Sequence, residues 1–238
     1  MIPPAVRDGA GPGDLRRLRG AVAVIAKTPE PGRVKTRLSP PLTPAQATDI
    51  AWVCLTESLR AVGAVASERH VLLLEGERGP WIPDGFEVIG QRGGDLGERL
   101  ASGFADIGDN AVVIAMDTPQ MDPAALADAL GLLESGHDSV IGPATDGGYW
   151  LIGLRAGVAS LPVFEGVPMS TGSTADAQIE RLAGLGLTTA MLGWLRDVDT
   201  IEDLWAQADD FPASALGRLA ARLREDSRSY GGRDGHHG

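Results

Sequence analysis

The sequence predicts a single α/β domain with one doubly wound sheet, mixed but mostly parallel, and helices on both faces. Three observations predict this fold. A length of 238 residues suits one α/β domain with ample material for a core. The composition, 43% hydrophobic and 22% charged, is ordinary for a globular protein. Short apolar runs alternate with helical patterns along most of the chain, as in sheets covered on both faces.

The two ends of the chain differ from the middle. Residues 1–20 mix Pro, Gly and Arg without periodicity, which predicts a flexible extension, and residues 225–238 predict a flexible tail. The domain then spans residues 21–224. The first residues lack the apolar core of a secretory signal, and a single cysteine suits a reducing compartment, so we expect a cytoplasmic protein. No apolar run approaches the roughly 20 residues of a membrane span, so we expect no membrane partner.

Strand predictions rest on short apolar runs bounded by turn-forming residues. Such runs lie at 21–26, 70–75, 86–90, 111–116, 138–143, 148–154 and 187–192.

Helix predictions rest on capping signals. Thr43 is followed by Pro44 and Gln46, an N-cap, a first-turn proline and a capping-box glutamine, which predicts a helix to about residue 62. Asp122 before Pro123 predicts another helix to about residue 134. Further helices are predicted at about 95–107, at about 174–185 and from about 200 onward.

Cations gather in the loop after the first predicted strand. Ligands of such sheets bind beyond the carboxyl ends of the strands, where the strand order reverses. Both lysines among the 21 basic residues lie in this loop, in a chain of net charge −11. With two arginines and a glycine that permits close backbone approach, the loop predicts a phosphate site formed by Lys27, Gly32, Arg33, Lys35 and Arg37. The alternative is a solvated basic loop. Neither a P-loop nor a dinucleotide glycine motif is present.

Aspartates follow two of the predicted elements. Asp117 stands directly after the fourth strand, where a carboxylate and phosphate oxygens can hold Mg²⁺; the alternative is a turn aspartate. Asp122 is explained as a helix N-cap. Asp197 and Asp199 alternate before a predicted capping box of Thr200 and Asp203, and either can supply a second metal ligand.

Two glycine-rich segments are further candidates. Residues 91–97 precede a helix and offer backbone N–H groups to a phosphate or a base edge. Residues 142–150 combine a carboxylate with two aromatic residues and suit acceptor binding; the alternative is a plain hairpin turn.

Other chemistries lack support. His70 and His137 stand far apart without a Cys/His set, which argues against zinc, and no GxSxG motif is present. Cys54 lies on an apolar helix face and is predicted to be core. Four tryptophans are predicted to be packing residues: Trp52, Trp81, Trp194 and Trp205. The acidic balance argues against nucleic acid as a partner.

Four motifs together resemble a known family. KTPEPGRVKTRL, DTP, GPATDGGYWLIGL and DVDTIEDL occur in this order, between about Ala21 and Leu204. They resemble a bacterial glycosyltransferase-like or nucleotidyltransferase-like family, related to 2-phospholactate guanylyltransferase and the molybdenum-cofactor guanylyltransferases. The resemblance implies a GT-A (nucleotide-diphospho-sugar transferase) fold, with the fourth strand beside the first.

The resemblance also implies roles, position by position. It places the phosphate loop at the cationic segment already described and a nucleotide-side segment at Gly93, Gly94 and Leu96. It makes Asp117 and Asp199 the metal ligands. The implied acceptor side comprises Asp146, Gly147, Gly148, Tyr149, Ser170 and Thr171.

These features predict a Mg- (or Mn-) dependent nucleotidyltransferase. A small anionic acceptor would attack the α-phosphorus of a nucleoside triphosphate, and pyrophosphate would leave. Lys35, Arg33 and Asp117 are the expected catalytic residues. One alternative is glycosyl transfer from a nucleotide-sugar on the same fold; another is a non-catalytic nucleotide-binding module. The base, the acceptor and the oligomeric state are left open by the sequence.

Overall fold

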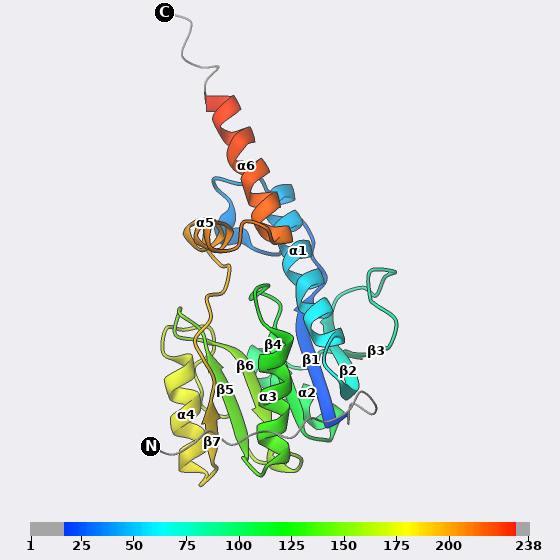
Figure 1. Ribbon diagram of the computed structural model, residues 1–238. Helices are drawn as coiled ribbons and strands as arrows, with labels where there is room; N and C mark the ends of the chain where they lie inside the picture. Colours follow the sequence, from blue (N-terminus) through cyan, green and yellow to red (C-terminus); the bar gives the residue numbers. More distant parts are fainter. Residues whose placement is uncertain (1–16, 232–238) are drawn as a thin grey trace, which may run out of the picture.

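A computed structural model describes residues 17–231 (Figure 1). Most of the predicted N-terminal extension, and the tail from residue 232, lie outside these residues. The predicted boundaries need correction, because the first strand already begins at Leu18 and the last helix continues to Gly231. Leu18 is drawn into the sheet by its backbone N–H, which donates to Ala66 O at 2.8 Å.

The sheet has seven strands in the order β3-β2-β1-β4-β6-β5-β7. Only β6 runs antiparallel to its neighbours within the described residues, which confirms a mixed, mostly parallel sheet with β4 beside β1. The strand bounds are β1 (Leu18–Lys27), β2 (Ser67–Glu75), β3 (Phe86–Gly90), β4 (Ala111–Ala115), β5 (Ser139–Pro143), β6 (Tyr149–Leu154) and β7 (Thr189–Met191).

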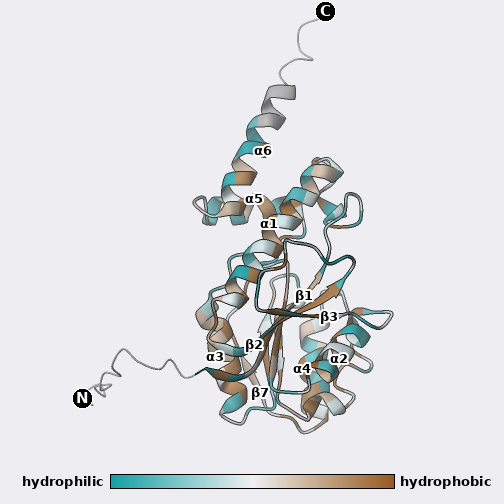
Figure 2. Ribbon diagram, turned by 90° about the vertical axis from the view of Figure 1, so that its right-hand side faces the viewer, coloured by the Kyte–Doolittle hydropathy of each residue, from teal (hydrophilic) through white to brown (hydrophobic). Residues whose placement is uncertain are grey.

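Helices cover both faces of this sheet, as predicted. In Figure 2, α1 and α3 lie on one face, and α2 and α4 on the other. The capping signals act as expected: the side chains of Thr43, Asp122 and Thr200 each accept a backbone N–H of the first turn. The bounds are α1 (Pro44–Gly63), α2 (Leu96–Ile107), α3 (Pro123–Glu134), α4 (Thr174–Gly184), α5 (Ile201–Asp210), α6 (Ala215–Gly231), and two 3₁₀ turns, η1 (Thr36–Leu38) and η2 (Val158–Ser160).

Alternation along the strands divides the main core in two. In β1, Val22 and Val24 pack into the cluster that includes α1 and α3, whereas Ala21 and Ala23 pack into the cluster on the opposite face. All four are fully buried. Because successive side chains of a strand point to opposite faces, one apolar run stabilises both layers.

A third core lies above the carboxyl ends of the parallel strands. There α5 and α6 pack with η1 and α1 (Figure 1). Leu38 and Val198 are both 0% exposed in this core. Leu38 follows the cationic loop and Val198 lies between two aspartates, so this core anchors two distant segments of the chain beside each other.

The single cysteine, Cys54, is buried in the third core, as predicted. One tryptophan prediction is wrong, because Trp194 is 64% exposed. Leu192 N–H and Leu195 N–H bond to β5 carbonyls, so the backbone on both sides of Trp194 is fixed to β5 while its side chain faces solvent. None of the helices within residues 17–231 combines the length and the hydropathy needed to cross a bilayer.

Candidate active site

The site lies where the strand order reverses, between β1 and β4. β2 and β3 follow on one side of β1, and β4 lies on the other, which opens a crevice beyond the strand ends. Lys27 ends β1, and Asp117 comes two residues after β4. Val198 N–H donates to Asp117 O at 2.9 Å, so the segment with Asp197 and Asp199 runs directly past Asp117.

Lys35 is the central cation of this crevice. Its backbone is left-handed, with φ 48°, and its side chain is only 5% exposed. The ammonium group forms ion pairs with Asp117 and, at 3.0 Å, with Asp199 Oδ1. Burial alone would lower the pKa of Lys35, but the two carboxylates hold it above its ordinary value, so the group stays charged.

The other cations of the loop form longer ion pairs with these aspartates or pair with other carboxylates. Arg37 Nη1 lies 3.7 Å from Asp199 Oδ2, with a side chain that is 73% exposed. Lys27 pairs with Glu75 at 3.2 Å, and Arg33 pairs with Glu30 at 2.9 Å. All three nevertheless line one cavity with Lys35, whereas Gly32, the remaining residue of the predicted phosphate site, does not line it.

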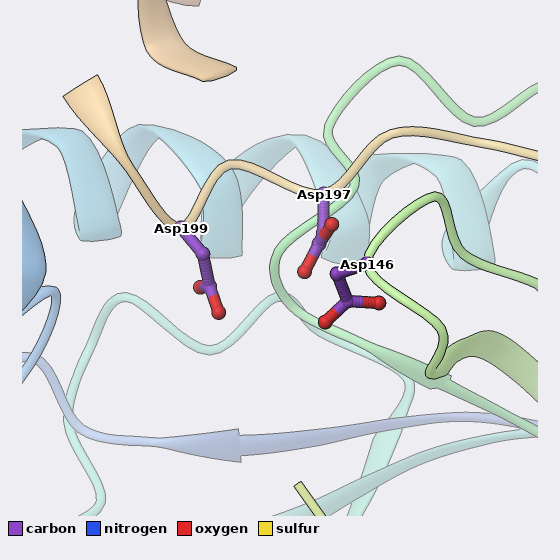
Figure 3. A group of neighbouring side chains, drawn as sticks. All are labelled: Asp146, Asp197 and Asp199. Atoms are coloured by element: carbon purple, nitrogen blue, oxygen red, sulfur yellow. The ribbon is translucent and has the colours of Figure 1, made fainter. Parts of the chain in front are cut away.

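Three carboxylates form a cluster beside this cavity. Asp146, Asp197 and Asp199 can each place one oxygen within 4.8 Å of the others. Figure 3 shows Asp197 and Asp199 on one segment and Asp146 on the loop between β5 and β6. Burial, with repulsion from Asp146 and Asp199, raises the pKa of Asp197 to about 6. Three hard oxygen donors at this spacing suit Mg²⁺ or Mn²⁺.

The cluster differs from the metal pair expected from the sequence. Asp199 is a member and Asp117 is not, although both pair with Lys35, and the cluster also includes Asp146, which was expected on the acceptor side. Asp146 lies in the turn from β5 to β6, where its Oδ1 accepts Gly148 N–H at 2.8 Å. The sequence feature that could have indicated Asp146 as a metal ligand is its carboxylate within a glycine-rich turn.

Three neighbouring cavities meet at Asp117. The cationic cavity, about 290 Å³, is lined by the loop lysines and arginines. The acidic cavity, about 450 Å³, is lined by the carboxylate cluster and by residues at the start of α4 and in the loop before it. The apolar cavity, about 250 Å³, lies between β1, β4 and α2. Asp117 lines all three.

Two N–H groups in and after the glycine segment before α2 already have carboxylate partners. Gly94 N–H donates to Glu98 Oε2 at 2.6 Å, and Asp95 caps Glu98 N–H at 2.8 Å. These carboxylates occupy the N–H groups, and neither Gly93 nor Gly94 lines the three cavities; Leu96 lines two of them.

The acceptor-side residues do come together. A Cβ at Gly147 would lie 2.0 Å from Gly172 O, so only glycine lets these two loops touch. Gly148, Tyr149, Ser170 and Thr171 line the acidic cavity. Sequence reasoning missed Thr118, which lines the same cavity, is 0% exposed, and has a hydroxyl without a hydrogen-bond partner in the described chain.

Comparisons with known proteins agree with this fold. Residues 53–171 match the model of a family described as "Uncharacterized protein conserved in bacteria (DUF2064)". No curated protein matches the chain.

Solved structures also match. One is described as a "putative nucleotide-diphospho-sugar transferase" from Desulfovibrio desulfuricans G20, with 27% identity, TM-score 0.76, and coverage of 90% of this chain and 96% of that one. A cytidylyltransferase from Leptospira borgpetersenii serovar Hardjo-bovis has 13% identity, TM-score 0.54, and coverage of 90% and 96%. CMP:2-keto-3-deoxy-manno-octonic acid synthetase, complexed with CTP, has 14% identity, TM-score 0.50, and coverage of 87% and 99%.

The first structure confirms the nucleotide-diphospho-sugar transferase type of fold, and the other two are alike in fold alone. The matches support the wider GT-A-like superfamily and not the two guanylyltransferase families that the motifs resemble.

Proposed function

The chain belongs to the DUF2064 family, and we propose that it is a metal-dependent transferase that moves a nucleotidyl group from a nucleoside triphosphate to a small acceptor. One observation carries the proposal: the buried Lys35 meets Asp117 and Asp199 where the cationic cavity joins the acidic one. A phosphate chain and an acceptor bound in these two cavities would meet at that point.

The transferase class has support beyond the site. The Desulfovibrio desulfuricans structure is 27% identical to the chain over 90% of its length. It is described as a "putative nucleotide-diphospho-sugar transferase". The described residues contain one cysteine, which is buried, and burial raises the pKa of its thiol to about 12. A thiolate nucleophile is therefore disfavoured, as expected for a transfer that depends on positioning and charge.

The cationic cavity suits the donor. Lys27, Arg33, Lys35 and Arg37 all line it, and Lys35 stays charged although it is buried. Asp117 and Asp199 also line this cavity of about 290 Å³, so its four cations exceed its two carboxylates and leave positive charge for a triphosphate. A fixed cation costs no reorganisation as charge develops on the leaving pyrophosphate.

The carboxylate cluster suits a divalent metal. Asp146, Asp197 and Asp199 would hold Mg²⁺ or Mn²⁺, with Asp117 beside them as the ligand implied by the resemblance. When bound, the metal would supply positive charge to phosphate oxygens. Lys35 pairs with both Asp117 and Asp199, so it orients these carboxylates before any ligand arrives.

The proposed transfer balances as follows. An acceptor oxygen forms a bond to the α-phosphorus of the donor, and the bond from that phosphorus to the β-phosphate bridging oxygen breaks. Pyrophosphate leaves with the electron pair. A proton on the attacking oxygen passes through a carboxylate of the acidic cavity to solvent.

Glycosyl transfer from a nucleotide-sugar is the second candidate. The description of the 27%-identical structure favours it. The four cations of the donor cavity favour the triphosphate instead, since a diphosphate donor carries less charge.

A ligand panel separates the two functions. We would measure the melting temperature with each nucleoside triphosphate and with common nucleotide-sugars, with and without Mg²⁺ or Mn²⁺. A ligand at a hundredfold excess over Kd stabilises by about 2.7 kcal/mol. Metal-dependent stabilisation by a triphosphate, lost in Lys35→Ala, supports nucleotidyl transfer. A preference for nucleotide-sugars contradicts it.

A further inference from the structure

We infer that the acceptor of this transferase is an uncharged polyhydroxyl compound, such as a sugar or polyol, bound in the acidic cavity. The inference rests on the proposed function only in taking that cavity as the acceptor side, and it holds for nucleotidyl and glycosyl transfer alike. It replaces the small anionic acceptor expected from the sequence.

The charge of the cavity carries the first step. Asp117, Asp146, Asp197 and Asp199 all line it, and Arg37 is the single cation among its lining residues, all of which the structure describes. Arg37 already faces Asp199 at 3.7 Å, and Lys35, which pairs with two of the aspartates, belongs to the cationic cavity. An acceptor phosphate or carboxylate would therefore meet four carboxylates, whose charge one divalent metal shared with the donor phosphates would only partly offset.

The remaining donors and acceptors suit hydroxyl groups. Asp146 lies at the exposed rim, and its carboxylate can accept hydrogen bonds from a ligand's hydroxyls. The Ser170 hydroxyl can both donate and accept there, whereas Thr171 Oγ1 already donates to Pro168 O at 3.3 Å and accepts Ser173 N–H at 3.4 Å. Because burial raises the pKa of Tyr149, its phenol stays protonated. Tyr149 and Trp150 also give the cavity apolar surface for the C–H groups of a sugar ring.

Thr118 provides an independent observation. Its side chain is fully buried, yet its hydroxyl has no partner within the described residues, although buried hydroxyls are normally satisfied. It lines the acidic cavity next to Asp117 in the chain. The oxygen is closed off from solvent, so a ligand hydroxyl would pair with it, as donor or acceptor, only once the Thr118 side chain turns toward the cavity.

In the transfer, an acceptor hydroxyl oxygen forms the new bond to the α-phosphorus and its O–H bond breaks. The proton leaves through a cavity carboxylate, and pyrophosphate departs as described above. The product is a nucleoside monophosphate ester of the polyol. With a nucleotide-sugar donor, the same hydroxyl would attack the anomeric carbon and release the nucleoside diphosphate.

The test compares neutral and anionic compounds of the same shape. Saturation-transfer NMR would measure binding of two matched pairs, glucose with glucose 6-phosphate and glycerol with glycerate, to the full chain with Mg²⁺. We expect a neutral compound to bind at least fivefold more tightly than either anion. Tighter binding of an anion, or no binding of a neutral compound, overturns the inference.

Three variants locate the binding. Asp146→Asn keeps the oxygen that accepts Gly148 N–H. Compared with the unchanged protein without Mg²⁺, so that no bound metal is lost as well, it should weaken the neutral compound at least threefold while improving glucose 6-phosphate. Thr118→Val should weaken the neutral compound without lowering the melting temperature, because it removes an unsatisfied buried hydroxyl. Asp128→Asn, an equal charge change at an exposed position of α3 away from the three cavities, is the control and should change nothing. Unchanged binding in both cavity variants also overturns the inference.

Nucleoside triphosphate binding, followed separately by thermal shift, distinguishes this failure from failure of the proposed function. If triphosphates bind and neutral compounds do not, only the acceptor class is wrong. If neutral compounds bind and triphosphates do not, only the donor is wrong.

Discussion

The two ends of the sheet differ in how completely their polar groups are satisfied. At the carboxyl ends of β1 and β4, a lysine is buried, three carboxylates lie close together, and the Thr118 hydroxyl has no partner in the described chain. Both non-glycine residues of positive φ in the described chain, Lys35 and Ser170, line cavities at this end.

At the opposite end of the sheet, a carboxylate has hydrogen-bond partners for both of its oxygens. Asp138, just before β5, pairs with Arg155, and its other oxygen accepts Thr188 N–H at 2.9 Å and Thr188 Oγ1–H at 2.8 Å. The contrast indicates that one end serves stability and that strain and unmatched charge are kept at the other for ligands.

Removing Lys35 should have the largest effect on ligand binding at the carboxyl ends of the strands. Lys35→Ala takes the buried cation from the donor cavity and leaves Asp117 and Asp199 without it. We expect triphosphate affinity to fall at least a hundredfold, or about 2.7 kcal/mol, measured by calorimetry. Lys27→Ala removes an exposed cation paired with Glu75 and should cost less than tenfold. Equal losses in the two variants would show that Lys35 has no special role.

A variant of Asp138 tests whether the opposite end of the sheet contributes to stability and not to ligand binding. Hydrogen bonds from Arg155 and from the backbone and side chain of Thr188 lower the pKa of Asp138 to about 2. Its charged form therefore stabilises the fold above the unfolded pKa of about 4, and this contribution is lost as pH falls from about 4 to 2. Asp138→Asn should lower the free energy of unfolding by about 2 kcal/mol at pH 7, with unchanged ligand binding. A loss of triphosphate binding at full stability would contradict the division between the two ends.

Replacing Asp197 should change the free energy of unfolding in the opposite direction from replacing Asp138. Its pKa is raised to about 6, so at pH 7 the folded state holds a charge that burial and neighbouring carboxylates disfavour. Asp197→Asn should raise the free energy of unfolding by about 1 kcal/mol above pH 6, and the gain should vanish below about pH 4, where the unfolded chain is also protonated. The same variant should weaken Mn²⁺ binding. Urea unfolding across this pH range measures the first effect, and a stabilisation independent of pH would argue against the charge as its cause.

The smallest effect is expected at the glycine segment before α2. Gly94 N–H is taken by Glu98, and a Cβ at Gly94 meets only Glu98 Oε2 at 3.4 Å. Gly94→Ala should therefore change triphosphate affinity less than threefold. A larger loss of affinity would show that this segment contributes to triphosphate binding.

Local sequence signals sufficed for most of the fold. The capping box at Thr43 and Gln46 and the N-cap at Asp122 set helix starts through contacts within four residues, which a single sequence displays. The start of β1 at Leu18 was missed, because it depends on pairing with a distant strand.

The site was harder to predict for the same reason. Lysine placement and the aspartate after β4 located the crevice, since residue type and strand ends suffice for that. The sequence could not show that Asp117 would face Lys35 while Asp146 joined Asp197 and Asp199. Nor could it show that Glu98 would occupy Gly94 N–H. The placement of the aspartates depends on distances between loops, and the third core anchors two of these segments through Leu38 and Val198.

The fate of the α-phosphate tests the central claim most directly. The chain would be incubated with Mg²⁺, a neutral polyol that binds it, and a nucleoside triphosphate labelled at the α-phosphorus. We predict that label appears on the polyol with one pyrophosphate released for each transfer, and that Lys35→Ala abolishes both. Label that stays in unreacted triphosphate, while a nucleotide-sugar donates its sugar to the same polyol, would contradict nucleotidyl transfer.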